Sequence, residues 1–505
     1  MFKIKIGIMK NTVTYCCLCF LFFFQIGFTQ ENAGTLKDSR PNIIFVMTDD
    51  QGMGDLSCLG NEVVKTPNID AFYEKSTRFT EYHVSPTCAP TRAALMSGQH
   101  EFRVGVTHTI LERERMALEV YTLPQALQSA GYQTGLFGKW HLGDADDYLP
   151  QNRGFNEVLM HGAGGIGQVN LGDFPPNKDN VCFDNILLHN DMVVKTMGFS
   201  TDVFFDAGLA WTKKQIDTKT PYFTYLSLNA PHAPLVAPKA YKKRFLELGY
   251  DEGTASRYGM IENIDDNFGR LMRKLEEWDA LDNTLVIFTT DNGATHLGGT
   301  LNGKKIRHFN AGLRGGKNSP YEGGDHVPLF MYWKGVLTEG KDINQLTAHL
   351  DLYPTFAELT GAKLPETMQP LEGLSLIPLL ENTATTWEDR LLFTHCGRWK
   401  TGMVNEAKYT KMAIRSQQWR FINNEELYDI NKDPGERKNV ASEHPDVIAK
   451  FQQPYNNWWS ASTPIMINEN RKRVKQQPLH TKYYEQLEAQ GIPYWSPNNG
   501  IAEKN

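Results

Sequence analysis

Short apolar runs alternate with longer segments of helical periodicity over most of this chain of 505 residues. The apolar runs predict β-strands at residues 42–48, 133–137, 222–228, 284–290 and 327–333. The periodic segments predict helices at residues 68–77, 92–96, 123–130, 201–216, 255–278 and 351–359. This alternation predicts an α/β fold in which helices sandwich one large mixed sheet. Ligands of such sheets bind beyond the carboxyl ends of the strands, so polar residues there are candidate site residues.

The pattern changes after Pro378. Residues 409–415 and 419–423 are typical of two short antiparallel strands, and residues 426–436 of a strand that leads into a turn. We expect a main α/β domain at residues 38–380, a small C-terminal α+β subdomain at residues 385–460, and an aromatic-rich extension at residues 461–505. The tail beyond residue 442 is too apolar for a disordered linker. We expect it to pack back on the body near the rim of the site, through Tyr455, Trp458, Trp459, Tyr483, Tyr484, Tyr494 and Trp495.

The N-terminal residues predict a signal peptide. An uncharged run at residues 11–30 follows three lysines, and its apolar centre at residues 15–24 is too short to span a bilayer comfortably. We expect residues 1–29 to be cleaved, with an uncleaved anchor as the alternative, and the product to be exported to the periplasm or secreted without a membrane span. The remaining cysteines, Cys58, Cys88, Cys182 and Cys396, have no disulfide or metal spacing, so stability must come from the core.

The net charge of the chain limits the classes of molecule that it can bind. The formal net charge is −6, which does not suggest nucleic-acid binding. If the substrate is a polyanion, its attraction must come from a locally basic pocket.

Two predicted strands end in residues that offer oxygen ligands. Asp49 and Asp50 follow the strand at 42–48, and Asp291 and Asn292 follow the strand at 284–290. Such residues are commonly turn formers. Neighbouring residues in a strand point to opposite faces, so Asp49 and Asp50 can reach one ion only where the strand breaks into a loop. A hard divalent cation prefers oxygen ligands of this kind.

The most specific motif is the run CAPTRAALMSG at residues 88–98. A lone cysteine ahead of a helix is often a buried structural residue. The run, however, resembles the signature C-x-P-[ST]-R-x-x-L-x-[ST]-G of the type I sulfatases. In that family the cysteine is oxidised after translation to formylglycine, and the hydrated aldehyde is the nucleophile.

Three further motifs resemble sulfatase segments and occur in the same order. They are GKWHLG at residues 138–143, APHAP at residues 230–234, and RGGKNSPYEGG at residues 314–324. Taken singly, each also fits a plainer structural reading, such as a packed histidine or a rigid turn. One position departs from the family: the arginine that commonly follows the last Gly-Gly by two residues is replaced here, where Asp325 and His326 stand.

The resemblance implies the alkaline-phosphatase-like sulfatase fold and hydrolysis of sulfate esters. It implies one metal ion, calcium in preference to magnesium, bound by Asp49, Asp50, Asp291, Asn292 and the formylglycine made from Cys88. Arg92 would steady the aldehyde hydrate, and Lys139 and Lys317 would hold the sulfate. His232 would protonate the leaving alcohol, and His141 would act as base when sulfate is released, although a sequence cannot settle which histidine does which. A formylglycine-generating enzyme is the implied maturation partner.

The substrate is a separate hypothesis. Residues 161–168, His296, Arg307, His308 and the tail resemble segments of exported bacterial sulfatases that act on sulfated polysaccharides such as ulvan and carrageenan. Tryptophans at a rim stack on sugar rings, but tryptophans such as Trp458 and Trp459 are as often core residues. We favour a sulfated polysaccharide, with an ulvan-like marine glycan first.

Three alternatives remain open, because fold alone does not define function. The first is an aryl or small-molecule sulfatase. The second is a phosphomonoester or phosphonate hydrolase on the same fold, which usually has Thr or Ser in place of Cys88. The third is a non-catalytic relative that binds sulfated glycans, although no nucleophile or ligand has been lost here.

Overall fold

The computed structural model describes residues 35–384, 386–472 and 474–497. The predicted signal peptide at residues 1–29 lies outside these residues. Among the described helices, none has the length and apolar character needed to cross a membrane. Cys58, Cys88, Cys182 and Cys396 are all free thiols, as their spacing predicts.

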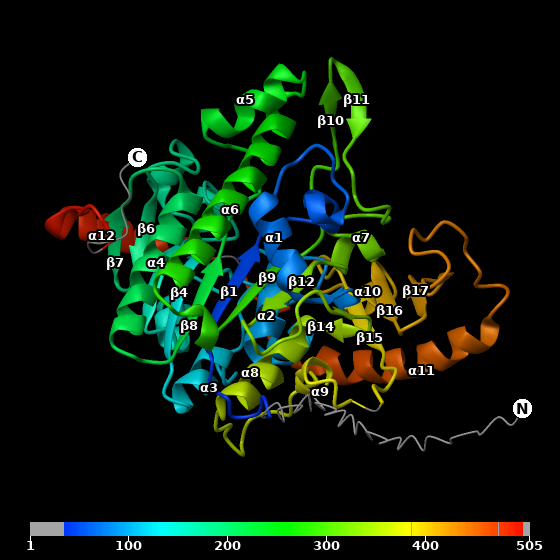
Figure 1. Cartoon of the computed structure of the whole chain (residues 1–505). Coiled ribbons are helices and arrows are strands. Elements are labelled where there is room, and N and C mark those ends of the chain that lie inside the picture. The colour runs from blue at the N-terminus through cyan, green and yellow to red at the C-terminus, as the bar shows by residue number, and fades with distance from the viewer. Residues whose placement is uncertain (1–34, 385, 473, 498–505) are drawn as a thin grey trace, which may run out of the picture. The chain divides into compact units, whose positions relative to one another are not determined.

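A sheet of ten strands forms the centre of the fold (Figure 1). Its spatial order is β13-β2-β12-β9-β1-β8-β4-β5-β6-β7. The middle strands from β9 to β5 run parallel, whereas β12 pairs antiparallel with β9, and β6 antiparallel with β5. The bounds are β1 Asn42–Thr48, β2 Thr77–Phe79, β4 Gln133–Lys139, β5 Glu157–His161, β6 Ile186–His189, β7 Met192–Lys195, β8 Tyr222–Ser227, β9 Thr284–Thr290, β12 Leu329–Tyr332 and β13 Asp342–Ile343. This sheet confirms the predicted mixed α/β fold.

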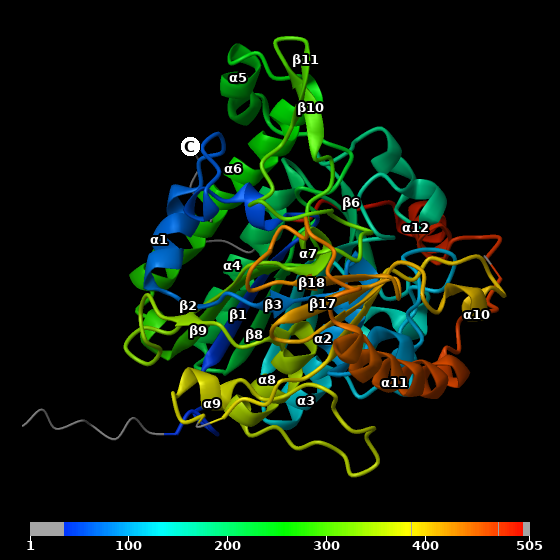
Figure 2. The same ribbon diagram turned by 90° about the vertical axis from the view of Figure 1, so that its right-hand side faces the viewer.

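Helices cover both faces of the sheet because the strands are apolar on both sides. In β1, Ile43 and Phe45 belong to one core, and Ile44 and Val46 to the other. Figure 2 shows the two helical layers. One contains α1 Pro67–Lys75, α4 Ser200–Asp217 and α6 Glu252–Glu277, with α5 Lys239–Glu247 against α6. The other contains α2 Cys88–Ser97, α3 Leu123–Ser129, α8 Leu352–Thr360 and α9 Ile377–Leu380.

A second sheet of four antiparallel strands lies in the C-terminal part, where the sequence predicts three of the four. Its strands are β15 Leu392–His395, β16 Met412–Arg415, β17 Trp419–Ile422 and β18 Glu426–Asp429. Other elements are β3 Tyr82–His83 with β14 Thr347–Ala348, the hairpin β10 Gly298–Leu301 with β11 Lys304–Arg307, α7 Glu322–Asp325, α10 Val404–Ala407 and α12 Pro478–Gln490.

The tail packs on the body, and Trp459 takes the core position that the sequence left as the alternative to a place at the rim of the site. Trp459 lies on α11 (Pro445–Ser462) and is 4% exposed in a core formed with the four-stranded sheet. Trp458 is half-buried and its ring contacts His100 and Phe393. Both residues stabilise the C-terminal core, because an amphipathic helix buries its aromatic face against the nearest apolar sheet.

Candidate active site

The chain breaks out of β1 immediately before the two acidic residues. Asp50 has a φ of 65°, in the left-handed region, so the chain turns sharply after Thr48. The turn removes the strand alternation that would separate the side chains of Asp49 and Asp50. Both are buried, and one ligand atom from each lies within 4.8 Å of the other and of a nitrogen of His232.

The neighbouring strand β9 brings the second pair of residues to the same place. β1 and β9 run parallel, with Thr48 opposite Thr290, so Asp291 emerges beside Asp49. The backbone N–H of Asp50 donates to Oδ1 of Asp291 over 3.2 Å. The side-chain amide of Asn292 donates to Oδ1 of Asp50 over 2.9 Å.

Cys88 is the first residue of α2, because the helix begins four residues earlier than the sequence predicts. Its Sγ lies within 4.8 Å of ligand atoms of Asp49 and Asp291. One turn further, Arg92 is fully buried and donates from two nitrogens to Oδ2 of Asp291, over 3.1 and 2.7 Å. Its third nitrogen donates to the hydroxyl of Ser227. Helix α2 therefore holds the thiol of Cys88 close to the carboxylates of Asp49 and Asp291.

Two lysines complete the charge balance. Lys139, the last residue of β4, pairs with Asp49 at 2.7 Å, and Lys317 pairs with Asp50 at 2.5 Å. Burial raises the pKa of the Cys88 thiol, but the two ammonium groups outweigh it and lower that pKa to about 7. The site thus stabilises negative charge at position 88.

Two histidines lie at the site in defined orientations. Nε2 of His141 donates to the carbonyl of Thr109 over 2.8 Å, which leaves Nδ1 buried without a hydrogen-bond partner. Nδ1 of His232 donates to the carbonyl of Ala233 over 2.5 Å, and its Nε2 lies 3.9 Å from Oδ2 of Asp50. Burial lowers the pKa of both imidazoles. Each ring therefore presents one nitrogen that is not used by the backbone.

A glycine-rich loop after β5 packs on both rings. A Cβ on Gly164 would lie 2.6 Å from Cε1 and Nε2 of His141, and a Cβ on Gly165 would lie 3.0 Å from Nδ1 of His232. Glycine is required here because a backbone approaches two imidazoles closely. The sequence indicates a role in substrate binding for residues 161–168, but it does not predict that this loop packs on the two histidine rings.

The residues present fit a hard divalent cation. Oδ1 of Asp49 and Oδ1 of Asn292 are buried and have no hydrogen-bond partner among the described residues. Burial, with the neighbouring carboxylates, raises the pKa values of Asp49 and Asp291 to about 6, although Lys139 opposes the effect. Buried oxygen atoms that lack donors, in carboxylates that ionise reluctantly, are what a bound cation would stabilise.

Several residues that support the site escape the sequence analysis. Ser227 closes β8, and its hydroxyl donates to the carbonyl of Lys139 over 2.7 Å. It lies inside the strand predicted at residues 222–228, one residue before the predicted end, so the sequence did not single it out. Thr295, which donates to Oδ2 of Asp50 over 3.3 Å, belongs to no motif. Glu469 pairs with Arg113 at 2.7 Å, from a segment distant in sequence.

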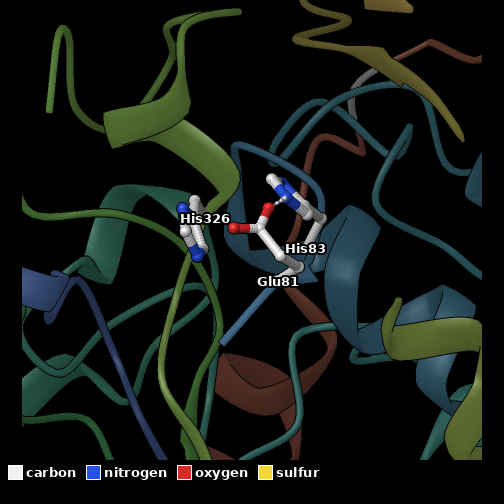
Figure 3. Close-up of side chains that lie close together, drawn as sticks. All are labelled: Glu81, His83 and His326. Carbon is white, nitrogen blue, oxygen red and sulfur yellow. Dashed lines mark ion pairs between the residues drawn. The ribbon is translucent and has the colours of Figure 1, made fainter. Parts of the chain in front are cut away.

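A second group of potential ligands lies nearby (Figure 3). Glu81, His83 and His326 bring one ligand atom each within 4.8 Å of one another, and the two imidazole rings stack at 4.8 Å between centroids. Glu81, however, pairs with Arg415 at 2.6 Å. His326 contacts Glu322 at 2.9 Å and a backbone carbonyl at 2.7 Å through its two ring nitrogens. Glu81 and His326 are thus already engaged in ion pairs and a hydrogen bond, so the group does not fit a metal site.

This group belongs to a buried ion-pair network between α7 and the C-terminal sheet. Arg415 contacts Glu322 at 3.0 Å, and Arg420 contacts Glu322 at 2.9 Å and Asp325 at 2.7 Å. Helix α7 follows the loop that carries Lys317, so the C-terminal sheet supports one wall of the site. His326, at the position where the sequence departs from the sulfatase pattern, is part of that support.

Comparisons with known proteins agree with this geometry. The sulfatase family model matches residues 41–362, and a model described as N-sulphoglucosamine sulphohydrolase, C-terminal, matches residues 316–461. The first match covers more than half of the chain, so the chain belongs to the sulfatase family and is a sulfuric ester hydrolase.

Individual relatives come from animals and bacteria. Arylsulfatase A of Homo sapiens is 30% identical over 471 residues, covering 83% of this chain and 88% of the relative. N-acetylgalactosamine-6-O-sulfatase of Bacteroides thetaiotaomicron is 27% identical and covers 83% of this chain and 93% of the relative. The crystal structure of Ps i-CgsB in complex with k-i-k-neocarrahexaose matches with a TM-score of 0.74 and 27% identity, over 89% of this chain and 98% of that chain.

Proposed function

We propose that this sulfatase removes sulfate from a sulfated polysaccharide or its oligosaccharides, after export and after conversion of Cys88 to formylglycine by a maturation enzyme. The observation that carries the proposal is the position of Cys88, at the N-terminus of α2 and within 4.8 Å of ligand atoms of Asp49 and Asp291. The likeness to Ps i-CgsB, whose structure holds a neocarrahexaose, supports a glycan substrate.

The hydrated aldehyde at position 88 would supply the nucleophile. Arg92, tied to Asp291 and Ser227, keeps the first turn of α2 in place. The helix N-terminus adds a positive field at that position. His141 has a free Nδ1, which is suited to accept a proton from a hydroxyl group at position 88.

The lysines would bind the sulfate group. Lys139 and Lys317 are paired with Asp49 and Asp50, so both ammonium groups already lie at the centre that would receive the sulfate. The unused Nε2 of His232 is the nitrogen that can donate a proton to the leaving oxygen.

A divalent cation, calcium in preference to magnesium, would be held by Asp49, Asp50, Asp291, Asn292 and residue 88. It would supply positive charge for the sulfate oxygens. Without it, the three aspartates are balanced by Arg92, Lys139 and Lys317, so the centre has no net positive charge to attract an anion.

The test is sulfate release from sulfated oligosaccharides of ulvan, carrageenan, fucoidan and glycosaminoglycans, beside an aryl sulfate and an aryl phosphate. We expect one class of oligosaccharide to be preferred, because sulfate alone offers few contacts for discrimination. Preference for the aryl sulfate, with every glycan refused, would show a small-molecule sulfatase. Faster hydrolysis of the aryl phosphate would show a phosphatase-like enzyme.

The maturation of Cys88 is tested on the same samples. Peptide mass mapping of active protein should find an aldehyde at position 88, and Cys88→Ala should abolish turnover. Fully active protein with only an unmodified thiol would remove the proposed nucleophile. The Cys88→Ala variant should keep its melting temperature within a few degrees, because it loses only a small side chain.

A further inference from the structure

A basic groove of about 810 Å³ lies beside the candidate active site. Three segments form it: residues 307–310, which begin at the last residue of β11, residues 312–314 before Lys317, and residues 435–437 after β18. Figures 1 and 2 both place the β10–β11 hairpin on the same side of the molecule as α7. Each segment contributes one arginine, namely Arg307, Arg314 and Arg437.

The groove has an excess of positive charge. The guanidinium groups of Arg307 and Arg437 are exposed and form no hydrogen bond or ion pair within the described chain. Arg314 lies over the ring of Tyr321 at 3.8 Å and contacts Glu426 at 3.2 Å.

The one acidic residue in the lining does not offset this charge. Glu436 is 1% exposed, and its carboxylate accepts from the backbone N–H of Glu322 over 3.0 Å, away from solvent. Burial raises the pKa of Glu436 to about 8, although Arg420 opposes the effect. Anionic groups are therefore attracted into the groove although the chain as a whole is negative.

The groove is continuous with the loops of the active site. Arg314 stands three residues before Lys317, and its carbonyl accepts from the N–H of Gly323 over 2.7 Å. A Cβ on Gly54 would lie 2.4 Å from the carbonyl oxygen of Phe309, so this wall packs directly on the turn that follows Asp50. The Phe309 ring is 42% exposed and offers an apolar face in the groove.

We propose that this groove binds a second acidic group of the substrate, a sulfate or carboxylate on a sugar near the one whose sulfate ester lies at Cys88. Guanidinium groups bind such anions through paired hydrogen bonds, and an exposed aromatic ring packs on a sugar. The preferred substrate is then an oligosaccharide with several acidic groups rather than a singly charged sulfate ester. This inference rests on the proposed function.

The test compares the double variant Arg307→Gln/Arg437→Gln with the wild type. The probes are hexasaccharides of carrageenan, ulvan, fucoidan and glycosaminoglycans, and an aryl sulfate with one charge. Each hexasaccharide is measured by kcat/KM if it is cleaved, and otherwise by its inhibition of aryl sulfate hydrolysis. For the best hexasaccharide, we expect kcat/KM or inhibitory potency to fall by about tenfold or more in the double variant. The kcat/KM for the aryl sulfate should fall far less, and the difference between the two probes should shrink at high salt.

Matched controls remove the same charge outside the groove. Lys304 lies on β11 three residues before Arg307 and so faces the other side of the hairpin, and Lys438 pairs with Glu443 at 3.1 Å. Lys304→Gln and Lys438→Gln should change both measurements by less than about twofold.

Either of two results would overturn the inference. One is an equal loss toward the hexasaccharide and the aryl sulfate, and the other is a panel in which no hexasaccharide is a substrate or an inhibitor. A third result separates the two proposals. If the enzyme cleaves only the aryl sulfate, and hexasaccharides inhibit the wild type but not the double variant, the proposed glycan substrate is refuted while anion binding in the groove is supported.

Discussion

Gly164 leaves space for the His141 ring, and this makes it a single-residue test of the site. The Gly164→Ala variant should lower kcat by about 100-fold, because the added methyl group displaces an imidazole that must be placed within about an ångström. The measurement is kcat on the best substrate together with the melting temperature. Gly298→Ala is the matched control, because the nearest atom to its Cβ lies at 3.8 Å. Equal effects of the two substitutions would contradict the proposed role of His141.

The acidic residues of the site predict that activity depends on a divalent cation. Chelation should abolish sulfate release, and added calcium or magnesium should restore it, because the buried Oδ1 atoms of Asp49 and Asn292 have no hydrogen-bond donor among the described residues and suit a cation. Asp291→Asn should raise the calcium concentration needed for half activation by at least about tenfold. A metal-free protein, verified by elemental analysis, that keeps its activity would contradict the metal site, and bound zinc would indicate a different centre.

At the scale of elements, the C-terminal extension supports the loop that positions His141. Glu469 pairs with Arg113 at 2.7 Å and accepts from the indole of Trp399 over 2.5 Å. The loop at residues 107–113 carries the Thr109 carbonyl that binds His141.

This contact predicts that Glu469→Gln destabilises the protein by about 1–3 kcal/mol, because it leaves the buried Arg113 without its counter-charge. It should also reduce kcat more than it raises KM, since Lys139 and Lys317, the lysines proposed to bind sulfate, are untouched. Urea unfolding and steady-state kinetics check both expectations. Glu485→Gln, an exposed change on α12, is the control, and an unaltered kcat in Glu469→Gln would separate the extension from the site.

The elements that sequence patterns predict well are the long apolar ones. All five predicted sheet strands and all six predicted helices are present, because burial on both faces requires uninterrupted apolar residues. The short strands β5, β6, β7 and β15, the exposed hairpin β10–β11, and the helices α5, α11 and α12 were missed. The missed strands are short, and their pairing partners rather than their own residues make them strands.

At the scale of the whole molecule, the ion pairs around His326 hold the C-terminal sheet against α7. Burial lowers the pKa of His326, but its contacts with Glu322 and Glu81 outweigh burial and raise it to about 9. The unfolded value is about 6.5. The contribution to folding is therefore complete below about pH 6.5 and is lost as the pH rises through about 9.

The free energy of unfolding should consequently fall by about 1–3 kcal/mol between pH 7 and pH 9.5. His326→Arg places a permanent charge beside Glu322, Glu81 and the stacked His83, and it should flatten that dependence. Urea unfolding at both pH values measures the difference. If the His326→Arg variant folds poorly, His326→Gln should still show the flattened slope, and an unchanged slope in both variants would exclude His326 as the titrating group.

The sequence by itself determined three features of this protein. Its motifs and their order indicated the sulfatase family and the candidate residues for the chemistry, and its apolar runs predicted the central sheet. Those features depend on local residue identity and on apolar spacing, both of which can be read without coordinates. Only the tertiary structure decided that Asp50 turns toward Asp49, that Glu469 supports the His141 loop, and that Arg307, Arg314 and Arg437 share one groove. Each of these depends on contacts between segments far apart in sequence, and such contacts form only when the two sheets and their helices pack together.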